Sequence, residues 1–358
     1  MNVEQRMNLI SQVGEEILTV EELQNLLETK KKFVAYDGFE PSGRMHIAQG
    51  ILRAININKM TAAGANFKML VADWHGWANN KMGGDLEKIQ NVGKYFIEVW
   101  KACGMDLENV EFVWVSDMVN DHNYWKKVMQ IARNSTVNRI VRCGQIMGRK
   151  EGEVMQASQI LYPCMQAADI FYLKADVCQL GMDQRKVNML AREIGPKLGY
   201  YKPVVVSHHM LAGLGQPVSD SKDAIDRVID LKMSKSKPDS AIFMTDNPED
   251  IKRKINKAYC LEKQIHENPI MEYNKYIVFE KFKSIKVERP AKFGGDIEIA
   301  SFEELQRIYS NGELHPMDLK NTTTKYIDKL VEPVRNHFEK NTKAKKLKEE
   351  IESYEVTR

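Results

Sequence analysis

The stretch that decides the fold of this chain is FVAYDGFEPSGRMHIAQ, which spans residues 33–49. Its first residues, Phe33–Tyr36, predict a short buried strand, and Pro41-Ser42-Gly43 predicts a tight turn. Beyond the turn, isoleucines recur every four residues at positions 47, 51 and 55. We therefore expect a helix from Arg44 onward, with His46 in its first turn.

A strand, a glycine turn and a helix start together form an arrangement that can hold a phosphate. Free backbone N–H groups and the helix dipole both point at the anion. His46 could then donate a hydrogen bond to a phosphate oxygen. A second interpretation stays open here, because a single histidine in a first helical turn is more often a surface residue or a cap.

Strand-like and helix-like segments alternate on both sides of this stretch. Residues 67–71, 111–115, 177–180 and 204–207 read as strands, with helices at 85–102 and 184–197. Such alternation predicts an α/β fold, a parallel sheet with helices on both faces. The first 30 residues read as helical, and the segment after Pro238 carries helical patterns rich in Lys and Glu. We predict an α/β domain at residues 1–240 and a mainly α-helical C-terminal domain at residues 241–358.

Composition excludes several classes of protein. The chain has 358 residues, is 43% hydrophobic and has no apolar run long enough for a membrane helix. The N-terminus lacks the apolar core of a secretory signal, so we expect a cytosolic protein without membrane contact. Five widely spaced cysteines without a C-x-x-C pair suggest neither a zinc site nor a disulfide framework. The net charge of +3 does not decide for or against a nucleic-acid partner.

A second phosphate-handling element is Lys-Met-Ser-Lys-Ser at residues 232–236. Two lysines with interleaved hydroxyls could close over a triphosphate, although a flexible surface loop has the same composition. Together with His46-Ile47-Ala48-Gln49, this pentapeptide resembles the HIGH and KMSKS signatures of class I aminoacyl-tRNA synthetases. Gln49 departs from that pattern, because it stands at the family's second histidine and cannot carry positive charge.

The resemblance implies a Rossmann-like catalytic domain that binds ATP. It implies that His46, Lys232 and Lys235 are catalytic, and that Mg²⁺ is bound through the ATP phosphates without a metal held by the protein. The implied ATP-binding residues are Gly43, His46, Gln49, Asp183, Lys232, Met233, Ser234, Lys235 and Ser236.

Three polar residues point to a small polar pocket. Tyr162, Gln166 and Asp169 stand at i, i+4 and i+7 in an otherwise apolar segment, so they share one helix face. An interdomain hydrogen-bond network is the alternative. Asp183 and Gln184 follow a predicted strand end, where open α/β sheets bind ligands. Asp183 could accept from ribose hydroxyls or could be a helix N-cap.

These residues resemble the tyrosyl-tRNA synthetases of the archaeal and eukaryotic branch. The resemblance implies that Tyr36 and Asp169 hold the phenol hydroxyl of L-tyrosine, while Tyr162, Gln166 and Gln184 hold its amino group and ring. Such a site rejects phenylalanine by leaving buried polar groups unpaired, and this enzyme class is the standard example of that effect. Tryptophanyl-tRNA synthetase is the nearest alternative, and the hydroxyl of Tyr36 argues against it.

Two C-terminal stretches, residues 292–296 and 315–320, resemble the anticodon-binding region of the same enzymes. The resemblance implies that Phe293 stacks on the first anticodon base of tRNA(Tyr), Asp318 reads its edge and His315 supports it. Without the resemblance, Phe293 would read as core and His315-Pro316 as a turn.

The resemblance also implies a homodimer. An insertion near residues 117–158 would supply a twofold contact, although its apolar residues, Val137, Ile140, Val141 and Ile146, fit a core equally well. Two alternative functions come from other classes of protein, namely a small adenylyltransferase and a non-catalytic tRNA-binding relative. The former lacks a helical tRNA domain, and the latter would have lost His46 or the lysine loop.

Overall fold

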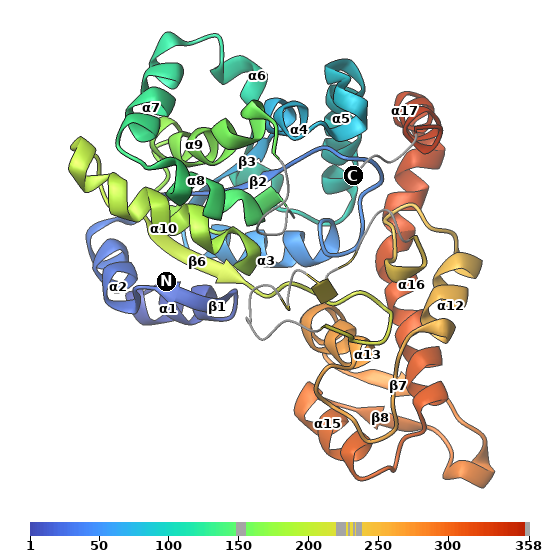
Figure 1. Cartoon of the computed structure of the whole chain (residues 1–358). Helices are drawn as coiled ribbons and strands as arrows, with labels where there is room; N and C mark the ends of the chain where they lie inside the picture. The colour runs from blue at the N-terminus through green and yellow to red at the C-terminus, as the bar shows by residue number, and fades with distance from the viewer. Residues whose placement is uncertain (148–154, 220–226, 228–229, 232, 234–237, 355–358) are drawn as a thin grey trace.

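The computed structural model describes the whole chain except residues 148–154, 220–226, 228–229, 232, 234–237 and 355–358 (Figure 1). Its centre is a sheet of six strands in the order β1-β6-β5-β2-β3-β4 among the described residues. Every neighbouring pair is parallel except β1 with β6, which is antiparallel. The strands are β1 (Gly14–Leu18), β2 (Phe33–Phe39), β3 (Ala65–Val71), β4 (Val110–Trp114), β5 (Val177–Cys178) and β6 (Val204–His208). The predicted parallel sheet is confirmed.

Helices cover both faces of this sheet, and each face has its own apolar core (Figure 1). The core on one face is formed with α1 (Val3–Ser11), α2 (Val20–Thr29), α3 (Ile51–Ala62) and α5 (Leu86–Ala102). The core on the other is formed with α7 (His122–Arg133), α8 (Val137–Cys143), α9 (Ala157–Tyr172) and α10 (Arg185–Ile194). Shorter pieces are α4 (Asp73–Ala78), α6 (Val115–Met118), η1 (Lys81–Gly84), η2 (Leu107–Asn109), η3 (Gly144–Met147), η4 (Met182–Gln184) and η5 (Pro196–Leu198).

Strand β2 divides its side chains between the two cores. Phe33, Ala35 and Phe39 lie in the core beneath α3, whereas Tyr36 lies in the core beneath α9. This division follows from the two-residue period of a strand. The neighbouring residues Tyr36 and Asp37, in the middle of β2, therefore point toward opposite faces of the sheet.

The part of the chain after residue 240 is mainly helical, as predicted. The short turn η6 (Pro238–Ser240) precedes this part. The elements of this part are α12 (Pro248–Lys257), α13 (Pro269–Tyr273), a π-helical turn η7 (Asn274–Val278), α14 (Phe279–Lys281), η8 (Ala291–Phe293), α15 (Phe302–Ser310), α16 (Pro316–Lys340) and α17 (Thr342–Glu352). A small antiparallel pair, β7 (Ile285–Val287) with β8 (Ile297–Ile299), was not predicted. The long helix α16 returns the chain toward the sheet domain, where α17 lies beside α5 (Figure 1).

Two local predictions were wrong. The first 30 residues are not uniformly helical, because β1 interrupts them and pairs with β6. Its sequence, Gly-Glu-Glu-Ile-Leu, has weak strand character of its own. The pairing partner lies nearly 200 residues away, so tertiary contact rather than local propensity makes this strand.

The predicted helix start at Arg44 was also wrong. Helix α3 begins at Ile51, after Gly50. Before it, Ile47 N–H donates to Ile242 C=O at 2.8 Å, and Met244 N–H donates to Met45 C=O at 2.9 Å. His46 therefore lies in a short bridge with Phe243 rather than in a first helical turn. The helix-dipole part of the phosphate argument does not apply to it. No helix in the described part of the chain is both long and apolar enough to cross a membrane.

Candidate active site

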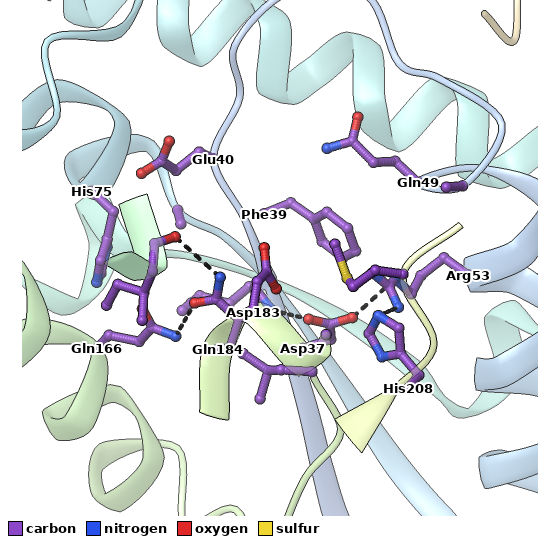
Figure 2. Close-up of a pocket in the computed structure, with 18 of the residues that line it drawn as sticks. Asp37, Phe39, Glu40, Gln49, Arg53, His75, Gln166, Asp183, Gln184 and His208 are labelled. Atoms are coloured by element: carbon purple, nitrogen blue, oxygen red, sulfur yellow. Dashed lines mark hydrogen bonds and ion pairs between the residues drawn. The ribbon is translucent and has the colours of Figure 1, made fainter. Parts of the chain in front are cut away.

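A cavity of about 220 Å³ lies where β2, β5 and β6 end (Figure 2). It gathers side chains that the sequence places up to about 200 residues apart. Gly43 is not among its lining residues, although its φ of 104° suits only glycine comfortably. Lys232, Ser234, Lys235 and Ser236 lie outside the described residues. The predicted site residues that line the cavity are Tyr36, His46, Gln49, Tyr162, Gln166, Asp169, Asp183, Gln184 and Met233.

One end of the cavity is built around a fully buried carboxylate. Asp169 of α9 has no exposed surface, and its Oδ1 accepts a hydrogen bond from the Tyr124 hydroxyl at 2.9 Å. Its Oδ2 lies 3.0 Å from His75 Nε2. Burial disfavours the imidazolium, but the charge and hydrogen bonding of Asp169 outweigh burial and raise the pKa of His75. The carboxylate is thus held from two sides.

Sequence reasoning missed both partners of Asp169. His75 belongs to the short helix α4 and Tyr124 to α7, and neither residue stands in a motif. A histidine and a tyrosine in ordinary helical patterns give no local sign of a shared partner. The residues are found only once α4 and α7 have packed against α9.

The phenols that line the cavity are neutral. Burial, with smaller contributions from Cys178 and Asp169, raises the pKa of Tyr36 well above its ordinary value. Burial, followed by Glu40, does the same for Tyr162. Both hydroxyls therefore remain able to donate as well as accept hydrogen bonds. The Tyr36 hydroxyl is buried and makes no hydrogen bond of good geometry within the described residues.

Two glutamine amides form a chain along the cavity wall (Figure 2). Gln166 Nε2 donates to Gln184 Oε1 at 3.0 Å, and Gln184 Nε2 donates to the Ile146 carbonyl at 3.1 Å. These bonds fix the orientation of both amides. Tyr162, Gln166 and Asp169 share one face of α9, as the spacing predicted, and Pro163 in its second turn does not break the helix.

The other end of the cavity contains Asp183 and Gln49, which the sequence analysis predicted to bind ATP. Asp183 is buried in the turn η4, directly after Gly181, which bridges to His208 of β6. A Cβ at position 181 would overlap both the Met210 sulfur and the Asp183 carboxylate, so a larger residue there would displace these two side chains. On the opposite wall, the Oε1 atom of Gln49 is buried without a hydrogen-bond partner in the described part of the chain.

Sequence reasoning also missed three charged or polar residues in the cavity floor, namely Asp37, Arg53 and His208. Arg53 interrupts the apolar run of α3, between Leu52 and Ala54. An arginine buried to 8% exposure in such a run is a sign that it has a partner. The sign was present in the sequence, but it did not tell which carboxylate the partner is.

The two anticodon-type stretches lie in loops of the C-terminal region. Phe293, at the end of η8, is 59% exposed, so it is not a core residue. His315 is exposed, and its Nδ1 accepts from Met317 N–H at 3.1 Å as the N-cap of α16. Arg289 joins the two loops, since its Nε donates to the Gly295 carbonyl at 2.7 Å and its Nη1 to the Glu313 carbonyl at 2.8 Å. Asp318 lies in the first turn of α16.

The four apolar residues predicted for a contact in the 117–158 insertion differ in burial. Ile140 and Ile146 are buried, and Ile146 lines the cavity, so these two belong to the chain's own core. Val141 is half-buried. Val137 is 66% exposed and is available for a contact with another molecule.

The chain is similar to known proteins over nearly its full length. Residues 28–332 match the family model described as tRNA synthetases class I (W and Y). The chain is 51% identical to Tyrosine--tRNA ligase 1, cytoplasmic, of Arabidopsis thaliana, over 99% of this chain and 90% of that protein.

Solved structures of tyrosyl-tRNA synthetases have the same fold as this chain. The tyrosyl-tRNA synthetase of Pyrococcus horikoshii, complexed with L-tyrosine, superposes with a TM-score of 0.91 at 39% identity, covering 98% of this chain and 100% of that one. The Leishmania major enzyme in complex with tyrosinol also gives a TM-score of 0.91, at 45% identity, and this chain spans 61% of its length. Sequence and fold thus match over nearly the full chain, and the chain belongs to the tyrosyl-tRNA synthetase family of class I tRNA synthetases.

Proposed function

We propose that this chain is a tyrosine–tRNA ligase, which uses ATP to convert L-tyrosine to tyrosyl-adenylate and then loads tyrosine onto tRNA(Tyr). The observation that carries the proposal is the buried Asp169, which His75 and Tyr124 hold in a cavity that also contains the Tyr36 hydroxyl. A buried acceptor beside a buried hydroxyl suits the phenol group of tyrosine. Phenylalanine would leave these groups unpaired at a cost of about 1–3 kcal/mol for each group.

The remaining cavity residues are assigned along the length of the substrates. Tyr162, Gln166 and Gln184 bind the amino group and ring of tyrosine, and the fixed amide chain supports this role. Asp183 accepts from the ribose of ATP. The phosphates meet His46, with Gly43, Gln49 and Met233 nearby and with the loop residues Lys232, Ser234, Lys235 and Ser236.

The first reaction is a direct displacement. A carboxylate oxygen of tyrosine attacks the α-phosphorus of ATP, the new O–P bond forms, and pyrophosphate leaves with the electron pair of the broken bond. The nucleophile is already ionised, so no general base and no covalent enzyme intermediate are required. His46, Lys232 and Lys235 stabilise the charge that develops on pyrophosphate. Mg²⁺ enters with ATP as part of the substrate, bound through the phosphates.

The second reaction uses the tRNA. A hydroxyl of the terminal ribose attacks the carbonyl carbon of tyrosyl-adenylate, and the new ester bond forms. The bond between that carbon and the phosphate oxygen breaks, AMP leaves with its electron pair, and the hydroxyl proton is released to water. We assign Phe293, His315 and Asp318 to the anticodon, and the exposure of Phe293 together with the Arg289 link between the two loops supports this assignment. An aromatic platform beside a carboxylate acceptor is a common way to read an unstacked base. We further propose a homodimer with its contact in residues 117–158.

The test is ATP–pyrophosphate exchange with the purified chain, run separately with tyrosine, tryptophan and phenylalanine. Exchange with tyrosine alone is the expected result. Exchange with tryptophan alone would keep the family but overturn the roles of Tyr36 and Asp169. Absence of exchange with all three amino acids, repeated in the presence of tRNA, would point instead to a non-catalytic tRNA-binding relative.

A further inference from the structure

The backbone around His46 is paired with a second segment of the chain, residues 242–244. His46 faces Phe243 in an antiparallel bridge, and one backbone hydrogen bond, of 2.8 or 2.9 Å, lies on each side of this pair. Met45 and Ile47, the neighbours of His46, are fully buried in the core. Because successive side chains of an extended segment point in opposite directions, His46 points away from that core and into the cavity that it lines. The direction of His46 thus depends on how firmly this pairing is held.

One buried carboxylate holds both segments. Asp246 is 3% exposed, and its Oδ1 accepts a hydrogen bond at 2.9 Å from Nη2 of Arg44, two residues before His46. Its Oδ2 accepts from the backbone N–H of Phe243 at 2.9 Å and from Lys254 Nζ at 2.6 Å. The backbone N–H of Asp246 donates to the Phe243 carbonyl at 3.0 Å. The residue opposite His46 and a residue of the His46 segment are therefore tied to one side chain.

The two cations that bind Asp246 make further contacts with the same segment. Lys254 Nζ donates to the Ala241 carbonyl at 3.0 Å. Arg44 Cζ lies 4.5 Å, and Lys254 Nζ 4.6 Å, from the centre of the Phe243 ring, at distances typical of cation–π contacts. We call Arg44, Phe243, Asp246 and Lys254 the Asp246 cluster. Its side chains do not line the cavity, so the cluster reaches the cavity only through the segment that carries His46.

Helices of the C-terminal region fix the Asp246 cluster in place. Lys254 belongs to α12, and Nη1 of Arg335 in α16 donates to the Asp246 carbonyl at 3.1 Å. The two helices lie side by side (Figure 1). A buried ion pair is often no more stabilising than apolar side chains of the same size. A role in fixing one arrangement of the chain therefore explains these charges better than a role in stability alone.

We propose that Asp246 is a positioning residue for His46, and that it acts together with Arg44 and Lys254. The cluster fixes the segment that directs His46 toward the phosphates of ATP during tyrosine activation. The proposal rests on the proposed function, in which His46 stabilises the charge that develops on pyrophosphate. A displacement of about 1 Å in such a group can lower a rate by roughly 10²-fold. Loss of Asp246 should therefore lower the rate of activation and leave the KM for tyrosine unchanged.

The experiment is a double-mutant cycle of Asp246→Asn and His46→Ala, measured by ATP–pyrophosphate exchange with tyrosine. Asp246→Asn should lower kcat roughly 10- to 100-fold at an unchanged KM for tyrosine. His46→Ala should lower kcat at least as much, and the double variant should be no slower than His46→Ala, because Asp246 then has nothing left to position. Losses that multiply in the double variant would show that Asp246 acts independently of His46. That outcome, or an unchanged kcat in either single variant, would overturn the proposal.

Further variants separate positioning from a merely structural role. Asp246→Asn leaves the buried Lys254 without its charged partner, so Asp246→Asn/Lys254→Met, which removes both charges, is measured beside it. The double variant should regain Tm but not kcat, and recovery of both would show that only the unpaired charge mattered. Arg44→Ala, at a partly exposed position, should lower kcat in the same direction.

The matched control is Asp176→Asn. Asp176 also accepts from a lysine, Lys30 at 2.6 Å, and from a backbone N–H, that of Val34 at 2.9 Å, but it does not line the cavity. Loss of these contacts should change no kinetic constant. An equal fall in kcat in Asp176→Asn would show that the effect of Asp246→Asn is not specific to the His46 segment.

Hydrogen–deuterium exchange gives a readout that does not depend on activity. In Asp246→Asn the amides of Ile47 and Met244, which join the two segments, should exchange roughly 10-fold faster or more, whereas the amides of α9 should not change. Unchanged deuterium exchange at Ile47 and Met244 would overturn the proposal. A wild-type chain without tyrosine-dependent pyrophosphate exchange would refute the proposed function itself, independently of the deuterium-exchange result for Asp246→Asn.

Discussion

At the scale of single residues, the proposed selectivity for tyrosine over phenylalanine depends on the side chains that hold the Asp169 carboxylate in place. Asp169 makes two buried contacts, one with His75 and one with Tyr124. A carboxylate held in this way cannot turn away when a substrate without a hydroxyl enters. In the proposed site, bound phenylalanine would leave these buried groups unpaired, so one missing hydroxyl would cause a large difference in rate between the two substrates.

Asp169→Asn should therefore reduce selection of tyrosine over phenylalanine. The substitution preserves size but replaces a charged acceptor, so kcat/KM for tyrosine should fall roughly 10- to 150-fold. This corresponds to a loss of about 1.5–3 kcal/mol in transition-state stabilisation. Steady-state pyrophosphate exchange with both amino acids measures the ratio. Tyr124→Phe removes one supporting hydrogen bond only and should have a smaller effect in the same direction. An unchanged tyrosine-to-phenylalanine ratio in Asp169→Asn would contradict the assignment.

Lys235→Ala tests the proposed stabilisation of pyrophosphate. Loss of one charged transition-state contact should lower the rate of tyrosine activation by roughly 10²-fold, about 3 kcal/mol. Tyrosine binding should stay unchanged, because the contact forms only as the leaving group develops charge. Single-turnover formation of tyrosyl-adenylate measures the rate. Lys237→Ala, just beyond the motif, is the control, and a raised tyrosine KM at normal kcat would refute the role of Lys235.

At the scale of elements, the loop after η8 and the start of α16 form one unit through Arg289. That unit holds Phe293 in an exposed position, so packing in a core does not explain why an aromatic residue stands there. Lys292 Nζ lies 4.9 Å from the centre of its ring, which adds positive charge beside a flat apolar face. Both features suit a nucleic-acid base.

Phe293→Ala should weaken aminoacylation without weakening activation. Loss of one base-stacking contact should cost about 1–3 kcal/mol, seen as a raised KM for tRNA(Tyr). Pyrophosphate exchange should not change, because the residue is remote from the cavity. Leu261→Ala is the matched control, since Leu261 is a similarly exposed apolar residue of the same region at 56% exposure. Asp318→Ala should behave like Phe293→Ala, and equal loss of both reactions would contradict an anticodon role.

At the scale of the whole molecule, one histidine connects the sheet domain with the C-terminal region. His209 follows β6, its Nδ1 lies 3.3 Å from Glu15 of β1, and its Nε2 lies 3.1 Å from Glu272 of α13. Its ring stacks on Tyr276 with centroids 4.2 Å apart. Burial opposes the charged form, but the two carboxylates outweigh burial and raise the pKa of His209 to about 9.

This junction predicts a pH dependence of stability. The pKa of His209 is raised above its unfolded value of about 6.5, so the stabilisation is complete below pH 6.5 and is lost as the pH rises through 9. The loss should be at most about 3 kcal/mol. Scanning calorimetry from pH 6 to 10 should show a falling Tm, after subtraction of the profile of His209→Gln.

His122→Gln, which replaces an exposed histidine, serves as the control and should follow the wild-type profile. Other groups near the junction, Lys275, the phenol of Tyr276 and the neutral His208, remain present in both proteins, so the difference between the profiles isolates His209. Identical profiles for wild type and His209→Gln would show that the junction does not depend on the charge.

The sequence by itself determined the features that depend on short-range periodicity. The alternation of strands and helices gave the parallel sheet, and the spacing of Tyr162, Gln166 and Asp169 gave one face of α9. Both are local, because a strand repeats every two residues and a helix every 3.6. The family motifs then identified nine of the residues that line one cavity, but they also included Gly43, which does not line it.

Only the tertiary structure decided which distant residues meet. Arg53 and His208 are 155 positions apart, and Tyr124 and Asp169 are 45 apart, so no local pattern records either contact. The strand β1 and the delayed start of α3 have the same origin, because both depend on backbone pairing with segments near residues 204–208 and 242–244. Long-range contacts satisfy buried polar groups that have no local partner, and in this protein they build both ends of the cavity, the end around Asp169 and the end around Asp183.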